Sequence, residues 1–318
     1  MPYFTHLHVH SHYSILDGMS KIPDLIKKCK ANGMYAMALT DHGNMFGIKD
    51  LVDTVNKENG KVKDKIKEQE AILQNDGASP EEKQEADAKI EQLKEQLFKP
   101  ILGIETYCAR RTLYDHDKNV TEVNAENGKV RIVDRSGWHL ILLAKNKQGY
   151  KNLCKLSSIA YMDGFYGTPR VDHNVLEQYH EGIICCSACL GGEVPQKILA
   201  GDLEGAEQSV LWFKNLYGDD YYIELQRHKT DKKGAATDTY AKQVKVNAVL
   251  VELARKHNIK MVATNDVHFV EESHGDAHDH LICISTQSDY NDPNRMRYTK
   301  QEWLKSPDEM AAIFDDLP

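Results

Sequence analysis

The feature that most constrains the fold is a repeated alternation of short apolar segments with segments of helical periodicity. This order of elements is typical of α/β proteins in which the strands pair in parallel and form a barrel. We therefore expect an α/β, barrel-like fold with seven strands, at about 4–10, 34–40, 100–108, 138–144, 183–186, 221–226 and 260–264. The intervening segments predict helices at 22–29, from about 45, and at 147–161, 193–200, 202–217 and 237–257.

Residues 57–98 differ from the rest of the chain because they are dense in Lys, Glu and Gln. Apolar residues recur in two legs at alternating steps of four and three, which is heptad spacing. Between the legs, Ser79-Pro80-Glu81-Glu82 predicts a helix start with a serine cap and a capping box. We expect an inserted antiparallel helical hairpin that projects from the barrel. Its charges indicate a solvated surface, with a protein-docking arm as the alternative.

Four histidines alternate near the N-terminus, at positions 6, 8, 10 and 12. On a strand, alternate residues share a face. A buried face normally carries Val, Ile or Phe, whereas neutral imidazole is the commonest metal ligand in proteins. A His-x-His pair could place two ring nitrogens on one ion, although a polar edge strand would show the same pattern.

Further residues of metal-ligating type lie beside the predicted strands. In βα barrels the chemistry collects where the strands end. The residues at such ends are His8, His10, His42, Cys189, Asp266 and His268. Glu105 lies inside its strand, where a carboxylate is costly unless it is paired or metal-bound. His139 begins its strand, so strand-end placement accounts for neither of these two residues.

Each signal has a second interpretation. The turn Thr40-Asp41-His42-Gly43 could cap a helix, and Glu105 could pair with an arginine. Cys186 and Cys189 have the spacing of a redox pair, but a thioredoxin-like motif should open a helix early in a different α/β pattern. Cys185, Cys186 and Cys189 together suggest a zinc knuckle, which would need a second Cys or His pair that is absent nearby. We favour one sulfur ligand from this loop. Several His, acidic and Cys residues beside separate strands are poorly explained by chance.

The composition limits compartment and partners. The net charge of −8 gives no excess of basic residues for gripping nucleic acid, so bound cations would have to attract phosphate locally. Seven cysteines, an odd number, fit a reducing cytoplasm better than a disulfide framework. No apolar run approaches the roughly 20 residues of a membrane span, and the start lacks signal-peptide features. We expect a cytoplasmic protein.

Several motifs together resemble the PHP (polymerase and histidinol phosphatase) domain family, particularly members at the N-terminus of bacterial replicative DNA polymerases. The resembling motifs lie at 6–18, 38–43, 103–107, 138–144, 188–194 and 264–269. Later stretches at 292–295 and 305–310 resemble the approach to a polymerase region. The resemblance implies a metal-binding barrel over 1–285, including the insertion, and the start of a connection to a polymerase region over 286–318.

The resemblance also implies a distorted seven-stranded barrel of PHP type with two to three divalent metal ions in one pocket. The nine ligand positions that carry over are His8, His10, Asp17, His42, Glu105, His139, Cys189, Asp266 and His268. By this analogy, one ion is held by His8, His10, Glu105 and Asp266. A second is held by Glu105, His139 and Cys189, and a third by Asp17, His42 and His268. Such ligands suit zinc, manganese or iron better than magnesium.

The implied activity is that of a metal-dependent phosphoesterase, specifically a 3′–5′ exonuclease that uses a metal-activated hydroxide. Glu105, Asp266 and His268 are the expected catalytic residues. The implied partners are a DNA 3′ end, bound weakly by the isolated domain, the polymerase region of the parent chain and other replisome subunits. One alternative is a metal-stabilised docking domain without activity, and another is a free-standing phosphatase.

Overall fold

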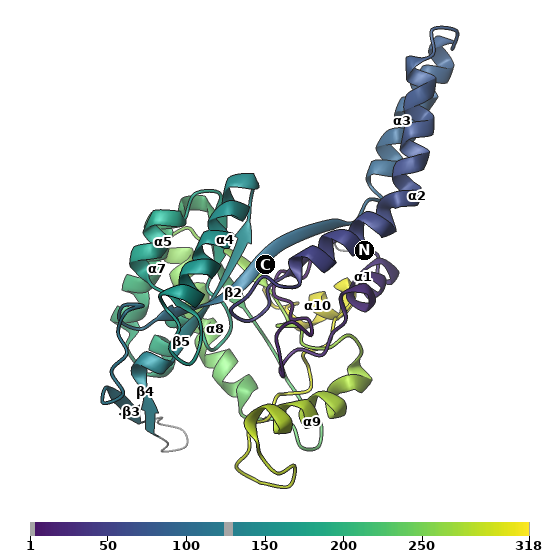
Figure 1. Ribbon diagram of the computed structural model, residues 1–318. Coiled ribbons are helices and arrows are strands. Elements are labelled where there is room, and N and C mark those ends of the chain that lie inside the picture. The colour runs from purple at the N-terminus through teal and green to yellow at the C-terminus, as the bar shows by residue number, and fades with distance from the viewer. Residues whose placement is uncertain (1–3, 124–129, 318) are drawn as a thin grey trace.

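The computed structural model describes residues 4–123 and 130–317 and contains one strongly curled sheet flanked by helices (Figure 1). The path of the sheet is β1 (Ala36–Leu39), β2 (Lys99–Ala109), β5 (Gly137–Ala144), β7 (Ile183–Cys186), β8 (Tyr221–Leu225) and β9 (Lys260–Ala263), and the seventh strand, β6 (Arg170–Val171), pairs with β2. The α/β class and the distorted seven-stranded sheet are therefore confirmed.

The N-terminal segment joins the two edges of this sheet. On one side Ala38 N donates to His6 O (2.9 Å) and Thr40 N donates to Val9 O (2.9 Å). On the other side His10 N donates to the carbonyl of Val267, which follows β9 (2.7 Å). The prediction of a regular strand over 4–10 is wrong, because the bonds alternate between two neighbours and form only isolated bridges with each. The segment nevertheless links β1 to the chain that follows β9.

The strands are not all parallel, which corrects the expectation from the sequence. β5 is antiparallel to both β2 and β7, whereas β1–β2, β7–β8 and β8–β9 are parallel. The described residues of the connection from β2 to β5 contain the short strands β3 (Thr121–Val123) and β4 (Val130–Ile132) and the turn η1 (Val133–Arg135), and among them there is no crossover helix. The chain can therefore reverse direction. As a result, β5 begins at the edge where its neighbours end.

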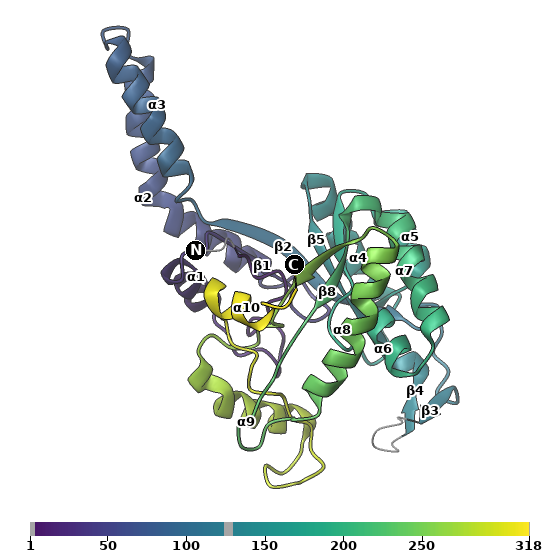
Figure 2. The same ribbon diagram turned by 180° about the vertical axis from the view of Figure 1, so that it is seen from behind.

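Helices cover the outside of the sheet (Figures 1 and 2). Those between the later strands are α4 (Lys147–Met162), α5 (His173–Tyr179), α6 (Glu193–Leu199), α7 (Leu203–Tyr217) and α8 (Thr239–Lys256), with the turn η2 (Gly218–Asp220) before β8. The others near the barrel are α1 (Ile22–Ala31), η3 (Glu272–His274), α9 (Gly275–Thr286) and α10 (Pro307–Ile313). The main core packs Leu142 and Ile223 of the sheet against Leu153, Phe213 and Leu250 of the helices. Within the described residues, no helix has the length and apolarity that a membrane span requires.

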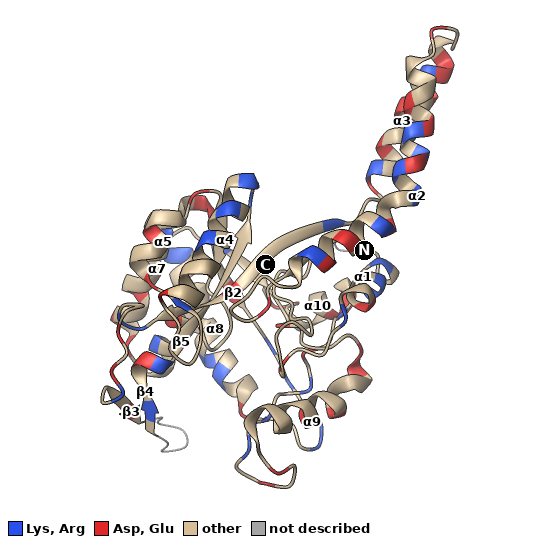
Figure 3. Cartoon of the chain, in the orientation of Figure 1, with Lys and Arg blue, Asp and Glu red and all other residues tan. Residues whose placement is uncertain are grey.

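The predicted helical hairpin is confirmed as α2 (Ile48–Gln74) and α3 (Pro80–Lys94), which project together from the barrel (Figures 1 and 2). Ser79 and Glu82 form the expected capping box. Ile66, Ile90 and Leu93 are buried between the helices, whose outer surface carries interspersed acidic and basic residues (Figure 3). The first helix begins at Ile48, so the insertion extends a helix that is rooted in the barrel.

Candidate metal centre

His8 and His10 extend from the N-terminal segment into the mouth of the barrel, and both are fully buried. Their Nε2 atoms lie 3.1 Å apart. Asp266, in the turn after β9, places Oδ1 at 3.1 Å from His8 Nε2 and 3.2 Å from His10 Nε2. These three ligand-type atoms are close enough to one another to surround a single ion.

Glu105 lies in the centre of the cluster because β2 continues beyond the end of β1. The pairing of β1 with β2 stops at Leu39 and Leu102, and the following turn at His42 bridges to Glu105. Glu105 Oε1 is 2.8 Å from His139 Nδ1, and Oε2 contacts His42 Nδ1. The position of this carboxylate inside a strand, which the sequence left unexplained, therefore follows from the unequal lengths of neighbouring strands.

His139 reaches the same cluster because β5 is antiparallel, so the start of this strand lies beside the ends of the others. The loop after β7 brings Cys189 Sγ to 3.5 Å from His139 Nδ1. A Cβ atom at Gly191 would lie about 3.0 Å from the His139 ring, so the loop approaches closely only with glycine there. Cys185 and Cys186 are buried within β7, which leaves Cys189 as the sulfur that this loop directs at the cluster.

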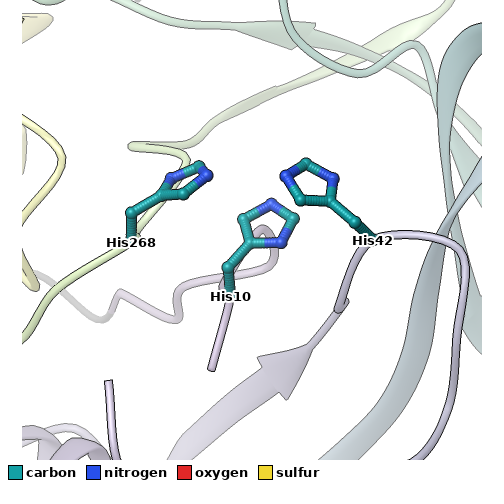
Figure 4. Close-up of side chains that lie close together, drawn as sticks. All are labelled: His10, His42 and His268. Carbon is teal, nitrogen blue, oxygen red and sulfur yellow. The ribbon is translucent and has the colours of Figure 1, made fainter. Parts of the chain in front are cut away.

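Asp17 joins the cluster on its outer side, where Oδ2 lies 2.8 Å from His42 Nε2 and 3.7 Å from His268 Nε2. The rings of His10, His42 and His268 converge in Figure 4, and their ligand atoms form a second group able to surround an ion. The structure thus brings all nine expected residues into one cluster. Their division among individual ions stays a prediction.

Two of the alternating histidines do not contribute to the cluster. His6 Nε2 donates to the carbonyl of Lys305 (2.8 Å), and His12 is exposed. His278, in the C-terminal histidine-rich stretch, lies 2.9 Å through Nε2 from the carbonyl of Asp17. Its Nε2 is also 3.9 Å from Asp17 Oδ1, so His278 borders the cluster and hydrogen-bonds to the backbone of one of its members.

Burial and neighbouring charges shift the pKa values of the cluster in opposite directions. Burial, reinforced by His42 and His268, lowers the pKa of His10 to about 3. Burial also acts on His268, but Asp17 and Asp266 outweigh it and raise its pKa to about 8. Burial, together with Asp266 and Glu105, raises the pKa of the Cys189 thiol. A bound cation would oppose this last effect, because thiolate is the form that ligates metal.

The donor set fits a divalent metal centre. Buried polar atoms normally have hydrogen-bond partners. Three atoms of the cluster, His42 Nδ1, Glu105 Oε2 and Asp266 Oδ1, form no hydrogen bond within the described chain, although each lies close to an ionisable neighbour. Imidazoles and carboxylates with one thiol are ligands typical of zinc, manganese or iron sites. Which metals bind, and how many, stay predictions.

The structure also shows residues around the cluster that the sequence did not predict. Glu224 Oε1 lies 2.7 Å from His8 Nδ1, and Ser14 Oγ lies 3.0 Å from His10 Nδ1. The Tyr298 hydroxyl donates to Asp17 Oδ1 (2.9 Å). Glu224 could have been found by the argument used for Glu105, because it is also a carboxylate in a core strand. Tyr298 has no such signal in the sequence.

The chain matches the family model of the PHP domain over residues 6–228. It is 38% identical over 316 residues to DNA polymerase III subunit alpha of Borreliella burgdorferi, covering 99% of this chain and 22% of that relative. It is 34% identical over 316 residues to the same subunit of Thermus aquaticus, covering 98% and 21%. The chain thus spans about a fifth of the length of these curated relatives.

Among solved structures, an amidohydrolase from Chromobacterium violaceum is similar to this chain, and the match covers 83% of this chain and 87% of the amidohydrolase. The two chains are 11% identical, and their TM-score is 0.41. The family model extends over more than half of the sequence and includes seven of the nine clustered residues. The chain belongs to the PHP domain family.

Proposed function

We propose that this chain is the metal-dependent phosphoesterase domain of a replicative DNA polymerase and acts as a 3′–5′ exonuclease. The observation that carries the proposal is the convergence of nine ligand-type side chains around Glu105. When bound there, neighbouring divalent ions would polarise a phosphoryl oxygen and lower the pKa of a bound water towards 7. No serine or cysteine nucleophile is required.

The geometry supports distinct roles for three residues. Glu105 Oε1 lies 3.3 Å from His8 Nε2 and 2.8 Å from His139 Nδ1, which are expected ligands of the first and the second ion, so this carboxylate is placed to be shared between those two sites. Asp266 and His268 line an open pocket of about 200 Å³ beside the cluster. In our proposal Glu105 holds the metal centre together, while Asp266 and His268 orient the reacting phosphate on the pocket side.

The relatives suggest the setting of this activity. Because they are named as alpha subunits of DNA polymerase III, we propose that the parent chain is a DNA-directed DNA polymerase. Its polymerase region and other replisome subunits would then be the partners, and a DNA 3′ end the substrate. We retain 1–285 as the metal-binding barrel and 286–318 as the start of the connection to the polymerase region.

A structural role is the second candidate, and one observation favours it. The cluster connects Asp17, Glu105 and Asp266, which lie on segments far apart in the chain. Metal bound there would crosslink these segments and stabilise the fold, because metal-binding free energy contributes to folding. In that case the domain would hydrolyse little or no phosphoester, and its bound metal would keep it rigid for the attached polymerase.

Hydrolysis of a single-stranded oligonucleotide labelled near its 3′ end distinguishes the two functions. Wild type, Glu105→Gln and the exposed arm control Glu95→Gln are assayed with added manganese or zinc, and the metal content of each is measured. We expect wild type and the control to release 3′ nucleotides. Glu105→Gln should lose metal and activity, since one negative charge is removed between packed cations.

His42→Ala removes a terminal ligand, one expected to bind a single ion, so we expect lower activity with part of the metal retained. Equal rates for wild type and Glu105→Gln would show that the hydrolysis has another source. Full metal occupancy without hydrolysis in the wild type would favour the structural role.

A further inference from the structure

One wall of the pocket beside the candidate metal centre is formed by residues 296–299 and Glu302, which lie beyond the part of the chain that the family model matches. Hydrogen bonds fix this segment to the barrel. Ala236 N donates to Tyr298 O (2.9 Å), and His268 N donates to Glu302 O (2.8 Å). The Tyr298 hydroxyl is also bound to a residue of the cluster. The segment is therefore held in a fixed position in the pocket wall.

Arg297 is the only Lys or Arg among the described residues that line this pocket. Its Nη2 donates to the carbonyl of Asp292 (2.8 Å), and its Nη1 donates to the carbonyl of Pro293 (2.8 Å). No carboxylate of the described chain forms an ion pair with it. Carbonyl groups orient the guanidinium without neutralising its charge, so the wall of the pocket carries a full positive charge.

This charge is separate from the proposed reaction centre. The metal ligands account for one phosphate, the one that is hydrolysed, and a small phosphate ester has no second phosphate for Arg297. A polynucleotide carries another phosphate one nucleotide away. Guanidinium groups bind phosphate through charge-assisted hydrogen bonds. Because the chain has a net charge of −8, it offers little general attraction for DNA, and one such contact would contribute measurably to the binding free energy.

We propose that Arg297 binds the phosphate adjacent to the scissile one, so that the pocket selects a polynucleotide strand over a small phosphate ester. This inference rests on the proposed phosphoesterase function for the scissile phosphate only. The residue acts in substrate binding and has no part in the chemical step.

Equilibrium binding tests the contact without hydrolysis. Binding of 5′-fluorescein-labelled oligothymidylate to the metal-free, full 318-residue chain is followed by fluorescence anisotropy over a range of salt concentrations. For Arg297→Gln we expect the Kd at low salt to rise about tenfold or more. The slope of log K against log salt should fall by about 0.7, the value for one phosphate contact on a single strand. Arg255→Gln, an exposed position on α8, should bind as wild type does.

Hydrolysis of two dinucleotides then tests which phosphate of the substrate Arg297 binds. The substrates are d(TpT) and d(pTpT), which differ only by a 5′-phosphate next to the scissile bond. Wild type loaded with manganese should prefer d(pTpT) by about tenfold in kcat/KM, and this preference should approach one in Arg297→Gln. Arg297→Lys, which keeps the charge, should retain the salt slope.

The outcomes separate the two proposals. An unchanged Kd and salt slope in Arg297→Gln would overturn the Arg297 contact, as would equal losses in Arg297→Gln and Arg297→Lys. A retained preference for d(pTpT) in Arg297→Gln would place the adjacent phosphate elsewhere. Failure of the metal-loaded wild type to cleave either dinucleotide would count against the phosphoesterase function, while the binding comparison would still decide the role of Arg297.

Discussion

His8 Nδ1 lies 2.7 Å from Glu224 Oε1, and neither side chain is accessible to solvent. The contact leaves His8 Nε2 directed at the cluster. Glu224 is held in turn, because the side chains of Gln226 and Thr264 both donate to the same oxygen. A carboxylate behind a ligating histidine fixes the orientation of the ring and raises its basicity. The candidate metal centre is therefore supported by a hydrogen-bonded carboxylate behind the expected ligand His8.

Replacing this carboxylate should weaken metal binding without removing a ligand. We expect Glu224→Gln to lower the metal affinity by about 10- to 100-fold, the range found for partners of ligating histidines. Competition with a chelator of known affinity measures the change. Glu252→Gln, exposed on α8, is the control. Equal affinities for Glu224→Gln and wild type would show that Glu224 does not act through His8.

Tyr298 supports the opposite side of the centre. Its hydroxyl donates to Asp17 at 2.9 Å to Oδ1 and 3.1 Å to Oδ2. Tyr298→Phe removes only this donor, so we expect a loss of about 1 kcal/mol in the free energy of unfolding of the metal-free chain. The metal content after dialysis should also fall, because Asp17 is less well oriented. Tyr290→Phe, a ring stacked on His280 at the surface, should change neither measurement.

The local elements could be predicted because they depend on nearby residues. The Ser79 capping box needs only Glu82, three residues away, and it forms as expected. The direction of β5 could not be predicted in the same way. It depends on whether the connection from β2 crosses over the sheet or turns back, and the polar stretch between these strands allowed either.

The nine expected ligands could be predicted, because they are of metal-ligating type and lie in the family motifs. Its supporting contacts were not, because they join distant residues. His8 and Glu224 are 216 positions apart, and Asp17 and Tyr298 are 281 apart. Periodicity reports which face of an element is apolar, but it carries no information about which polar groups meet across the fold.

The projecting arm should be separable from the metal centre. Its apolar contacts form a cluster of their own around Ile66 and Ile90. At its base, Asn59 Nδ2 donates to Phe98 O (2.8 Å) and Asn59 Oδ1 accepts from Phe98 N (2.9 Å). Replacing residues 62–95 by a short Gly-Ser linker preserves these two bonds. We expect this deletion to leave the metal content unchanged, as measured by elemental analysis.

A comparison at the base of the arm sharpens this test. Asn59→Ala in the intact chain leaves the buried backbone groups of Phe98 without their partner, and it should lower the free energy of unfolding by about 1–3 kcal/mol. Loss of metal on deletion of 62–95, with a fold otherwise intact by circular dichroism, would mean that the arm belongs to the site.

Glu193, which is not one of the nine expected ligands, should make the stability of the barrel sensitive to acid. It is 4% exposed, and its Oε1 accepts from Lys197 Nζ (2.8 Å) and Ser209 Oγ (2.6 Å). His173 Nε2 lies 3.1 Å from Oε2, and the buried Cys108 thiol is close by. Burial favours the protonated acid, but His173, Lys197 and Ser209 together lower the pKa of Glu193 from 4.5 to about 2.

Because its pKa is lower in the folded chain, this carboxylate stabilises the fold fully above about pH 4.5. The contribution is lost as the pH falls towards 2 and amounts to about 3 kcal/mol at most. Glu193→Gln cannot titrate at this position. The difference in free energy of unfolding between wild type and Glu193→Gln should therefore be about 2 kcal/mol smaller at pH 3 than at pH 6. Urea unfolding at both pH values measures this, with exposed Glu204→Gln on α7 as the control. A deficit that stays constant over this range would show that the three partners do not hold Glu193 ionised.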